Sequence, residues 1–364
     1  MASSGRPKKE PREPMLDEVG VSQRETFERC EAKWFYSQLM GTQGWGLIPT
    51  AAQIHFDWGT IGHAGLRVWY DGLRSGLSPE EAMIPAQQAI EATLAEFELP
   101  PDDNSLEITK SFMEGYSLWY APDCRKKVRA VEWSFTIPAE IFYSPQMVEQ
   151  ACRQFGCLSI PAIRGTVDLI CQPEDNVFEV TDHKFVGIVN RAVEEKLAYW
   201  KQPIVYSRAV KLLWSCDHVR YVHNQVRKPA KGLRPKFNKS NGTVESAADF
   251  LGRIRQEYVE FPDYNEAYPN NKVGYFHRSD AFDVDVDSQS FLWELIALDA
   301  QMSVKRDMLP ESIGYMDRPW YIPRKSPGVA CEAYFTKCPY QLLCSYGQTP
   351  ATMPFFVERE RPHP

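Results

Sequence analysis

The stretch from residue 163 to residue 186 has the pattern that restricts the fold most. Its two halves, IRGTVDLICQ (163–172) and NVFEVTDHKFV (176–186), alternate apolar and polar residues, which is typical of β-strands. The residues PEDN (173–176), where the two halves meet, are ones that tight turns prefer. The pattern therefore predicts two strands that pair as a hairpin.

The predicted hairpin carries three charged residues in otherwise apolar surroundings. Because strand side chains alternate, Asp182 and Lys184 share one face and His183 points to the other. Asp168, on the first strand, can lie beside Asp182. Two adjacent carboxylates repel each other unless a cation joins them, and their hard oxygen atoms suit Mg²⁺ or Mn²⁺. A site for metal-assisted phosphodiester hydrolysis and a plain buried Asp–Lys pair both fit this spacing.

Helical and strand patterns flank the hairpin in the sequence. Ser22 is predicted to cap the first helix in a capping box with Glu25, and Ser78 to cap the helix that begins at Pro79. Pro203 marks a break or a first turn. The order of elements favours a single α/β domain with a helical N-terminal portion. The predicted helices cover 21–40, 57–76, 79–97, 105–120, 191–213 and 288–306, and the predicted strands cover 128–142, 163–172, 176–186, 219–228 and 282–287.

Composition limits the class of protein. No run approaches the roughly 18 apolar residues of a membrane span, and the N-terminus MASSGRPKKEPREP lacks the apolar segment of a secretory signal. We therefore expect the nine cysteines to be reduced in a cytosol, which favours metal binding over disulfides. A net charge of −7 argues against a protein coated in basic surface, but it allows DNA binding through a local basic groove.

The segment CEAYFTKCPYQLLC (331–344) concentrates three cysteines near the end of the sequence. Three thiolates leave a tetrahedral metal site short by one ligand, so the fourth has to come from elsewhere in the chain. Four thiolates would suit a [4Fe–4S] cluster or Zn²⁺ equally well.

Two further motifs flank the acidic hairpin in the sequence, GTIGHAGL (59–66) before it and YWKQPIVYSRAV (199–210) after it. Together the three stretches resemble the PD-(D/E)XK nuclease superfamily, and specifically its RecB-like exonuclease branch. That branch includes the AddB nuclease domain, the CRISPR-adaptation exonucleases and phage-type relatives. The resemblance extends in order from residue 22 to residue 346.

The resemblance implies a role for each matching residue. His63, Asp168 and Asp182 would bind a divalent cation, Mg²⁺ or Mn²⁺, and the backbone carbonyl of His183 would be a further ligand. This sequence departs from many relatives at Phe185, where they have threonine, and at Pro203, which follows the glutamine of the Q-x3-Y motif. The catalytic residues that the resemblance implies are Lys184, Asp182, Asp168, Gln202 and Tyr206.

The resemblance also implies a fourth cysteine ligand. Iron–sulfur members of the family use one early cysteine and three late ones, and Cys30 in FERCEAKWFY resembles the early one, although Glu31 stands where proline is common. We therefore expect a structural [4Fe–4S] cluster that joins the two ends of the chain. Its ligands would be Cys30, Cys331, Cys338 and Cys344.

The implied fold is an α/β, restriction-endonuclease-like core, in which helices flank a mixed central sheet, with a helical N-terminal portion and a C-terminus held by the iron–sulfur cluster. The expected organisation is a single nuclease domain between two tails. Its parts are a disordered tail (1–14), the nuclease domain (15–350) divided into a helical portion (15–125), a catalytic core (126–306) and an iron–sulfur segment (307–350), and a C-terminal tail (351–364).

A basic stretch, RKPAKGLRPKFNKSNG (227–242), begins at the end of the strand predicted over 219–228. It is either a solvated insertion or a clamp on the phosphate backbone of DNA, blind to base sequence. In the second case the DNA-binding residues are Arg227, Lys228, Lys231, Arg234, Lys236 and Lys239.

The sequence and its resemblance together predict a metal-dependent DNA exonuclease that acts at single-stranded ends, in the cytoplasm of a bacterial or phage-infected cell. Three other hypotheses stay open. The chain could be active only in a complex with recombination, phage-replication or CRISPR-adaptation proteins. It could be a non-catalytic DNA-binding scaffold of the same fold, or a zinc-stapled protein whose acid pair is incidental.

Overall fold

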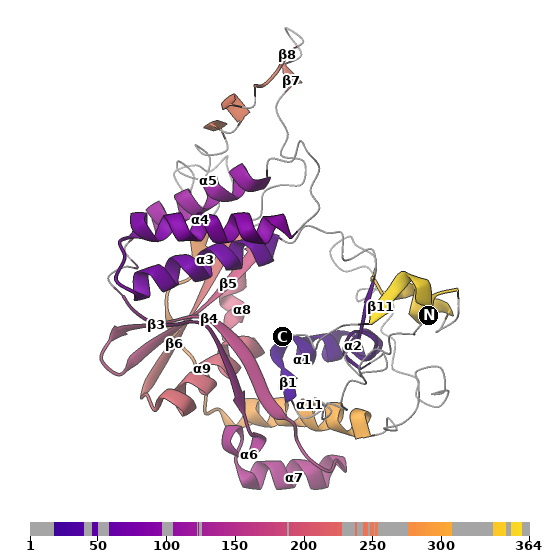
Figure 1. The fold of residues 1–364 in the computed structure, drawn as a ribbon. Helices are drawn as coiled ribbons and strands as arrows, with labels where there is room; N and C mark the ends of the chain where they lie inside the picture. Colours follow the sequence, from indigo (N-terminus) through magenta and orange to yellow (C-terminus); the bar gives the residue numbers. More distant parts are fainter. Residues whose placement is uncertain are drawn as a thin grey trace, which may run out of the picture. The chain divides into compact units, whose positions relative to one another are not determined.

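A computed structural model gives the fold of the chain (Figure 1). No helix in the part of the chain that it describes combines the length and the apolar character that crossing a membrane requires. The residues that the structure describes are 18–39, 46–49, 58–96, 105–121, 123, 126–187, 189–227, 237–238, 243–246, 248–250, 252–253, 276–307, 338–346 and 351–358.

The chain divides into two compact units, and among the described residues the boundaries between them fall inside β3, β4 and the helix that begins at Gln289. The predicted division into a helical portion, a catalytic core and an iron–sulfur segment stays a prediction. The first unit comprises Met1–Gln53, Thr136–Arg164 and Ser290–Pro364, and the second comprises Ile54–Phe135 and Gly165–Gln289.

A mixed β-sheet forms the centre of the fold, which confirms the predicted α/β class. β4 (Ala162–Glu174) and β5 (Val177–Val186) pair antiparallel, as the sequence pattern predicts, with Leu169 opposite Thr181. β6 (His218–Arg227) then pairs parallel to β5 along its whole length. The sheet is therefore antiparallel on one side of β5 and parallel on the other.

Further strands extend this sheet to seven among the described residues. β3 (Lys127–Ile137) pairs with β4, and β1 (Glu18–Gly20) pairs parallel with the first residues of β4. β9 (Phe276–Arg278) and β10 (Phe282–Asp283) each pair antiparallel with β6. A separate two-stranded pair joins β7 (Phe237–Asn238) to β8 (Thr243–Val244).

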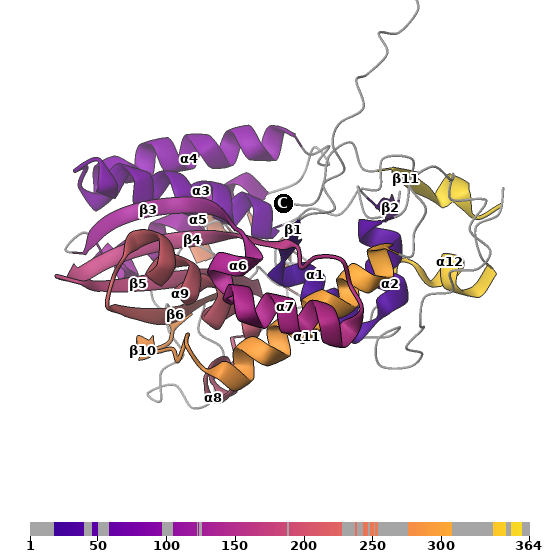
Figure 2. The same ribbon diagram turned by 90° about the horizontal axis from the view of Figure 1, so that it is seen from below.

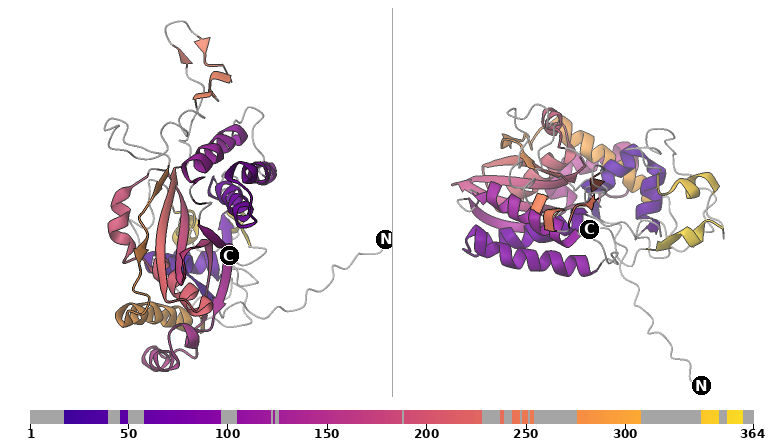
Figure 3. Two further views of the ribbon diagram at one scale, coloured as in Figure 1. Left: turned by 90° about the vertical axis from the view of Figure 1, so that its left-hand side faces the viewer. Right: turned by 90° about the horizontal axis from the view of Figure 1, so that it is seen from above.

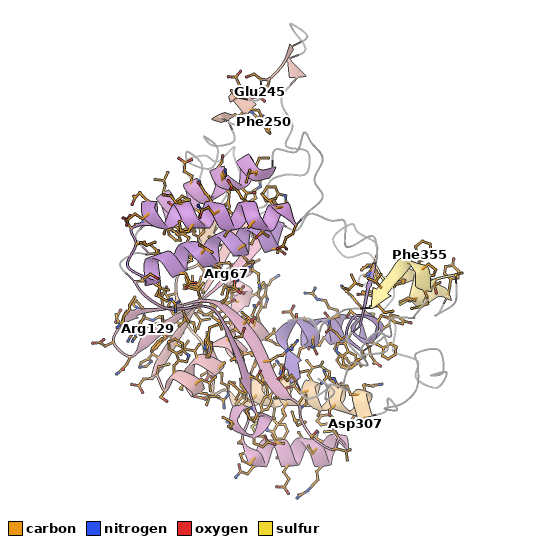
Figure 4. All side chains as sticks on the ribbon, in the orientation of Figure 1. Arg67, Arg129, Glu245, Phe250, Asp307 and Phe355 are labelled. Atoms are coloured by element: carbon orange, nitrogen blue, oxygen red, sulfur yellow. The ribbon has the colours of Figure 1, made fainter. Side chains whose placement is uncertain are left out.

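Side chains also join β3 to β4. Arg129 Nε, on the arginine labelled in Figure 4, donates to Gln172 Oε1 at 2.8 Å. The hydroxyl oxygens of Ser134 and Thr166 lie 3.0 Å apart and share a hydrogen bond. These contacts tie β3 to the strand that carries Asp168.

Helices cover both faces of the sheet in the second unit. α3 (Trp58–Arg74), α4 (Pro79–Ala95) and α5 (Ser105–Trp119) lie on one face, and α9 (Lys201–Trp214) lies on the other (Figure 3). A core cluster that includes residues of α3, α4, α5 and β4 is shielded from water, so burial of apolar surface holds these helices on the sheet. The short helices η4 (Arg191–Val193) and α8 (Glu194–Leu197) precede α9.

The two predicted helix caps have opposite outcomes. Ser78 caps α4 and forms a complete capping box with Glu81, which confirms the predicted start of that helix. The cap at Ser22 is wrong, because α1 (Val21–Arg29) already begins at Val21 and its N-cap, Gly20, makes no side-chain capping bond.

Three predicted elements are shorter than their patterns. The helix predicted over 21–40 is interrupted at Cys30, and α2 (Glu31–Gln38) follows the interruption. The strand predicted over 128–142 ends at Ile137, because Pro138 begins a short helix, α6 (Ala139–Phe142), in place of strand residues. The acidic strand predicted from Phe282 to Asp287 is limited to the two residues of β10.

The first unit is built mainly from α1, α2, α6, α7 (Pro145–Phe155) and α11 (Gln289–Asp307). Figure 2 shows α6 and α7 beside α11. Fully buried Arg24, on α1, forms a two-pronged ion pair with fully buried Asp299, on α11. Tyr143 donates to the same carboxylate at 2.6 Å.

The end of the described chain belongs to the first unit as well. β11 (Phe356–Glu358) pairs antiparallel with β2 (Leu47–Pro49), so residues near the end of the sequence pair with residues near its start. α12 (Gln341–Tyr346) and η7 (Met353–Phe355) precede β11. The Tyr340 hydroxyl donates to the carbonyl of Leu47 at 2.7 Å.

Candidate metal site and catalytic residues

The β4–β5 hairpin places its acidic side chains next to each other in the second unit. The register that pairs Leu169 with Thr181 sets Asp168 beside Asp182. The backbone N–H of His183 donates to Asp168 Oδ2 at 2.6 Å, which holds that carboxylate against β5. Lys184 Nζ donates to Asp182 Oδ1 at 3.0 Å, so these two side chains do share a face of the sheet.

α9 approaches the same face with the two residues of the Q-x3-Y motif. Gln202 Nε2 donates to Asp182 Oδ1 at 2.7 Å, and the side chain of Tyr206 is buried one turn further on. Pro203 does not disturb this geometry, because it lies in the first turn of α9, where backbone N–H groups have no partner within the helix. The helix therefore keeps Gln202 within reach of Asp182.

His63 comes from α3, which packs on the other face of β5. Gly62 allows the approach: a Cβ atom there would lie 2.0 Å from the ring of Phe185. The rings of His63 and Phe185 are 5.3 Å apart. Phe185, which departs from the family pattern, thus packs on the helix that carries His63.

Glu132, on β3, is a candidate ligand that the sequence pattern did not single out. Glu132 Oε1 lies 3.5 Å from His63 Nδ1, and Asp168 Oδ1 lies 3.9 Å from the same nitrogen. One ligand atom from each of these three residues lies within 4.8 Å of the others. The structure thus gathers His63 and Asp168 with Glu132, while Asp182 stands next to this group and is held by Lys184 and Gln202.

A signal for Glu132 is present in the sequence. Apolar residues alternate at Val128 and Ala130 and then at Phe135 and Ile137, so the alternation shifts by one residue between the two pairs. Such a shift is typical of a β-bulge, and bulges are frequent beside active sites. Glu132 lies at the shift and has a φ of 47°.

Burial and neighbouring charges shift the pKa values of three residues at the site. Burial raises the pKa of Asp168, and the neighbouring carboxylate of Asp182 raises it further, to about 7. Burial lowers the pKa of Lys184, but Asp182 and Asp168 outweigh that effect and raise it above its usual value. Burial likewise lowers the pKa of His63, and the carboxylates of Glu132 and Asp168 outweigh it and raise the pKa. A cation bound beside Asp168 and Asp182 would therefore favour the ionised form of Asp168.

His183 is held from its other side by a polar cluster. Asn224 Nδ2 donates to His183 Nδ1 at 2.8 Å and to the hydroxyl of Tyr116 at 2.9 Å. The His183 ring also stacks on Tyr70, with ring centroids 5.7 Å apart. Burial holds the pKa of His183 well below its usual value, so its ring is neutral and serves to fix the strand between Asp182 and Lys184.

The described residues fit a divalent cation such as Mg²⁺ or Mn²⁺. Carboxylate oxygens and an imidazole nitrogen are suitable donors, and they converge from α3, β3 and β4. Asp182 is only 2% exposed, and its Oδ2 atom accepts no hydrogen bond from the described residues, although Nδ1 of His223 lies 3.8 Å from it. A buried carboxylate oxygen without a donor is a position that a cation can satisfy.

Three of the four predicted cluster cysteines lie in one core of the first unit. Cys30 is buried between α1 and α2, and Cys338 and Cys344 pack against the same cluster of residues. Burial raises the pKa of Tyr36 to about 12, and the nearby Cys344 and Cys30 add to the shift, so Tyr36 lies close to both thiols. Cys331 lies outside the described residues.

Of the predicted DNA-binding residues, Arg227 is the last residue of β6. The others lie outside the described part of the chain, and they are Lys228, Lys231, Arg234, Lys236 and Lys239.

Comparison with known families agrees with this fold. The profile of the PD-(D/E)XK nuclease superfamily matches residues 18–345, which is most of the chain. The chain therefore belongs to the PD-(D/E)XK nuclease superfamily, a family of metal-dependent nucleases whose substrate is DNA. No curated protein matches the chain.

Proposed function

We propose that this chain is a metal-dependent DNA exonuclease that acts at single-stranded ends and carries a structural [4Fe–4S] cluster. The observation that supports it most is the arrangement of Asp168, Asp182 and Lys184 on one hairpin of a chain that belongs to a nuclease superfamily. Exonuclease action and single-stranded ends rest on the resemblance to the RecB-like branch.

The cation would be held by His63, Asp168 and Asp182, together with the backbone carbonyl of His183. A bound Mg²⁺ or Mn²⁺ supplies an activated water and offsets charge on the phosphate. The Asp168 carboxylate is oriented for this role by the His183 N–H, and the Asp182 carboxylate by its two donors, Lys184 and Gln202.

Lys184 acts in its charged form. Its pKa is raised, so the ammonium group persists at neutral pH and is a poor base. Its side chain is 39% exposed, which leaves it able to reach a substrate phosphate. We infer that it donates a hydrogen bond to the attacking water or to the phosphate oxygen on which charge develops.

Gln202 and Tyr206 act by positioning. Gln202 fixes one oxygen of Asp182, and Tyr206 packs where Gly165 leaves room, since a Cβ at that glycine would lie 2.9 Å from its ring. Burial and the charge of Asp182 raise the pKa of Tyr206, so its hydroxyl stays neutral. Tyr206 therefore lines the site as an uncharged residue that can form hydrogen bonds.

End-labelled DNA tests the activity. We expect the protein to degrade linear single-stranded DNA with Mg²⁺ or Mn²⁺ and to leave circular single-stranded DNA intact. Lys184→Ala should remove the activity, whereas Glu174→Gln, an exposed change on the same strand pair, should not. Undiminished cleavage by Lys184→Ala would refute the proposed site, and cleavage of the circle would refute the exonuclease.

The proposed cluster has its own test. We infer that Cys30, Cys331, Cys338 and Cys344 bind [4Fe–4S], because three of them gather in one core from positions about 300 residues apart. Protein purified without oxygen should be brown and absorb near about 400 nm, and Cys30→Ser should lose the colour. A colourless protein that contains zinc would contradict the iron–sulfur assignment.

The basic segment from Arg227 to Lys239 is proposed to bind the DNA backbone. Each phosphate contact makes binding more dependent on salt, so replacing two of its lysines, Lys231 and Lys236, with glutamine should reduce the slope of log affinity against log salt by about 2. Binding should weaken equally for all base sequences. An unchanged slope in a fluorescence-anisotropy titration would show that the segment is only a solvated insertion.

A further inference from the structure

The alternation of buried residues in β3 shifts by one residue around Glu132. Val128 and Ala130 are buried, and so are Phe135 and Ile137, although strict alternation from Ala130 would bury even-numbered positions. Glu132 lies at this slip, with its backbone in the left-handed region that residues with a side chain seldom adopt. A shift of this kind is typical of a β-bulge, and bulges are frequent beside active sites.

The Glu132 carboxylate meets His63 and Asp168. Glu132 and Asp168 approach the same imidazole nitrogen, at 3.5 Å and 3.9 Å, from two neighbouring strands. Two carboxylates that converge on one point repel each other, so this arrangement is favourable when a cation lies among them. The buried Oδ2 atom of Asp182, next to Asp168, has no hydrogen-bond partner among the described residues.

We propose that Glu132 is a direct ligand of the divalent cation, together with His63 and Asp168. The proposal rests on the proposed metal-dependent function and adds to it a ligand outside the Asp-x13-Asp-x-Lys hairpin. It places β3, as well as the β4–β5 hairpin, at the metal site.

An alternative role for Glu132 is to orient His63 by accepting a hydrogen bond from its ring, as carboxylates often do for metal-binding histidines. The two roles differ in what happens when His63 is absent. A direct ligand contributes to cation affinity whether or not His63 is present. A residue that acts through His63 contributes nothing once that ring is removed.

The experiment is a double-mutant cycle on Mn²⁺ affinity, measured by isothermal titration and by the electron paramagnetic resonance signal of free Mn²⁺. The chain is used whole, and no DNA is present. The variants are wild type, Glu132→Gln, His63→Ala, the double variant and the control Glu174→Gln, which removes an equal charge from an exposed position.

We expect Glu132→Gln to weaken Mn²⁺ binding by about tenfold or more in the wild-type background and again in the His63→Ala background. The Glu174→Gln control should bind as the wild type does. Equal affinity of Glu132→Gln and wild type would overturn the proposal. So would an effect that disappears in the His63→Ala background.

A second variant separates loss of a ligand from loss of the fold. Asparagine tolerates the left-handed conformation better than glutamate does, and its side chain is too short to reach His63 in the same way. Glu132→Asn should therefore melt at the wild-type temperature or higher and still bind Mn²⁺ weakly. Wild-type affinity in this variant would overturn the proposal.

The outcome for the wild type distinguishes this inference from the proposed function. If the wild type binds Mn²⁺ and cleaves DNA while Glu132→Gln does both equally well, only the role of Glu132 fails. If the wild type neither binds Mn²⁺ nor cleaves DNA, the proposed function fails, and the role of Glu132 fails with it.

Discussion

The two units of the chain differ in how completely their buried carboxylates are paired with hydrogen-bond donors. In the first unit, fully buried Asp299 is matched by both prongs of Arg24 and by the hydroxyl of Tyr143. In the second unit, Asp168 and Asp182 lie side by side with Glu132 nearby, and one Asp182 oxygen has no donor among the described residues. The negative charge of Asp299 is therefore fully paired by neighbouring side chains, whereas the charges of the carboxylates in the second unit are paired only in part.

This difference distinguishes a structural charge from a functional one. A buried ion pair with every oxygen bonded needs nothing from outside, so its role is to hold α1 to α11. In the second unit, burial raises the pKa of Asp168 and the Asp182 carboxylate raises it further, although His63 and Lys184 act in the opposite direction, so a bound cation would favour the ionised form of Asp168. Mutations at the Arg24–Asp299 pair should therefore change mainly stability, and mutations at the Asp168–Asp182 site should change mainly metal binding.

The largest expected effect is on stability, from the first unit. Arg24→Ala leaves Asp299 buried with only Tyr143 as a partner, and it should lower the free energy of unfolding by about 3–5 kcal/mol. Urea unfolding followed by circular dichroism measures the change. The double variant Arg24→Met with Asp299→Leu should recover part of the loss, because it removes both charges. A single variant as stable as the wild type would remove the contrast between the two units.

The next effect is on activity, from the second unit. Asp168→Asn keeps the shape of the side chain but removes a charge from the metal site, so cleavage of single-stranded DNA should fall by about 10²–10³-fold. The same substitution should leave the circular dichroism spectrum unchanged. Retained activity would mean that Asp168 belongs with the structural carboxylates.

Stabilisation by added metal should also distinguish a variant of the first unit from a variant of the metal site. Mn²⁺ at about 100 times its dissociation constant should raise the free energy of unfolding of the wild type by about 2.7 kcal/mol, because it binds only the folded state. Arg24→Ala should gain the same amount, since its metal site is intact, and Asp168→Asn should gain nothing. A thermal-shift series with Mn²⁺ would show this pattern, and equal gains in all three proteins would contradict it.

The smallest effect concerns Asp168 in protein kept free of metal by a chelator. Its folded-state pKa, about 7, lies above the ordinary value of 3.8, so ionisation of Asp168 destabilises the folded state. The metal-free wild type should gain stability from this group as pH falls from about 7 towards about 4. Asp168→Asn should therefore be more stable than the wild type by about 1 kcal/mol at about pH 8.

Urea unfolding at two pH values checks this sign. The advantage of Asp168→Asn should shrink at about pH 6, where the wild-type carboxyl is protonated in the folded state. An advantage that grew on acidification would show that Asp168 is stabilised as an anion and is not repelled by Asp182.

Local pattern was sufficient for part of the site. The hairpin of β4 and β5, and with it the pairing of Asp168 with Asp182 and Lys184, followed from alternation and a turn of four residues. The Ser78 cap followed in the same way. These features depend on residues close together in the sequence, where backbone geometry leaves few choices.

Other features depended on packing between distant segments. Pattern alone did not reveal that the strand predicted over 128–142 ends at Ile137, or that Cys30 interrupts the first helix. Phe185 departed from the family pattern, yet it packs on Gly62 and so supports the position of His63. Its role could be seen only when α3 and β5 were in contact.

By itself, the sequence determined the fold class, the family and the acidic hairpin, because each is encoded in the order and alternation of neighbouring residues. The tertiary structure alone decided that Glu132, His63 and Asp168 meet, since they come from three elements separated by dozens of residues. The alternation of β3 shifts by one residue around Glu132, and Gly62 lets α3 approach β5. Such contacts arise from three-dimensional packing, which the linear pattern does not express.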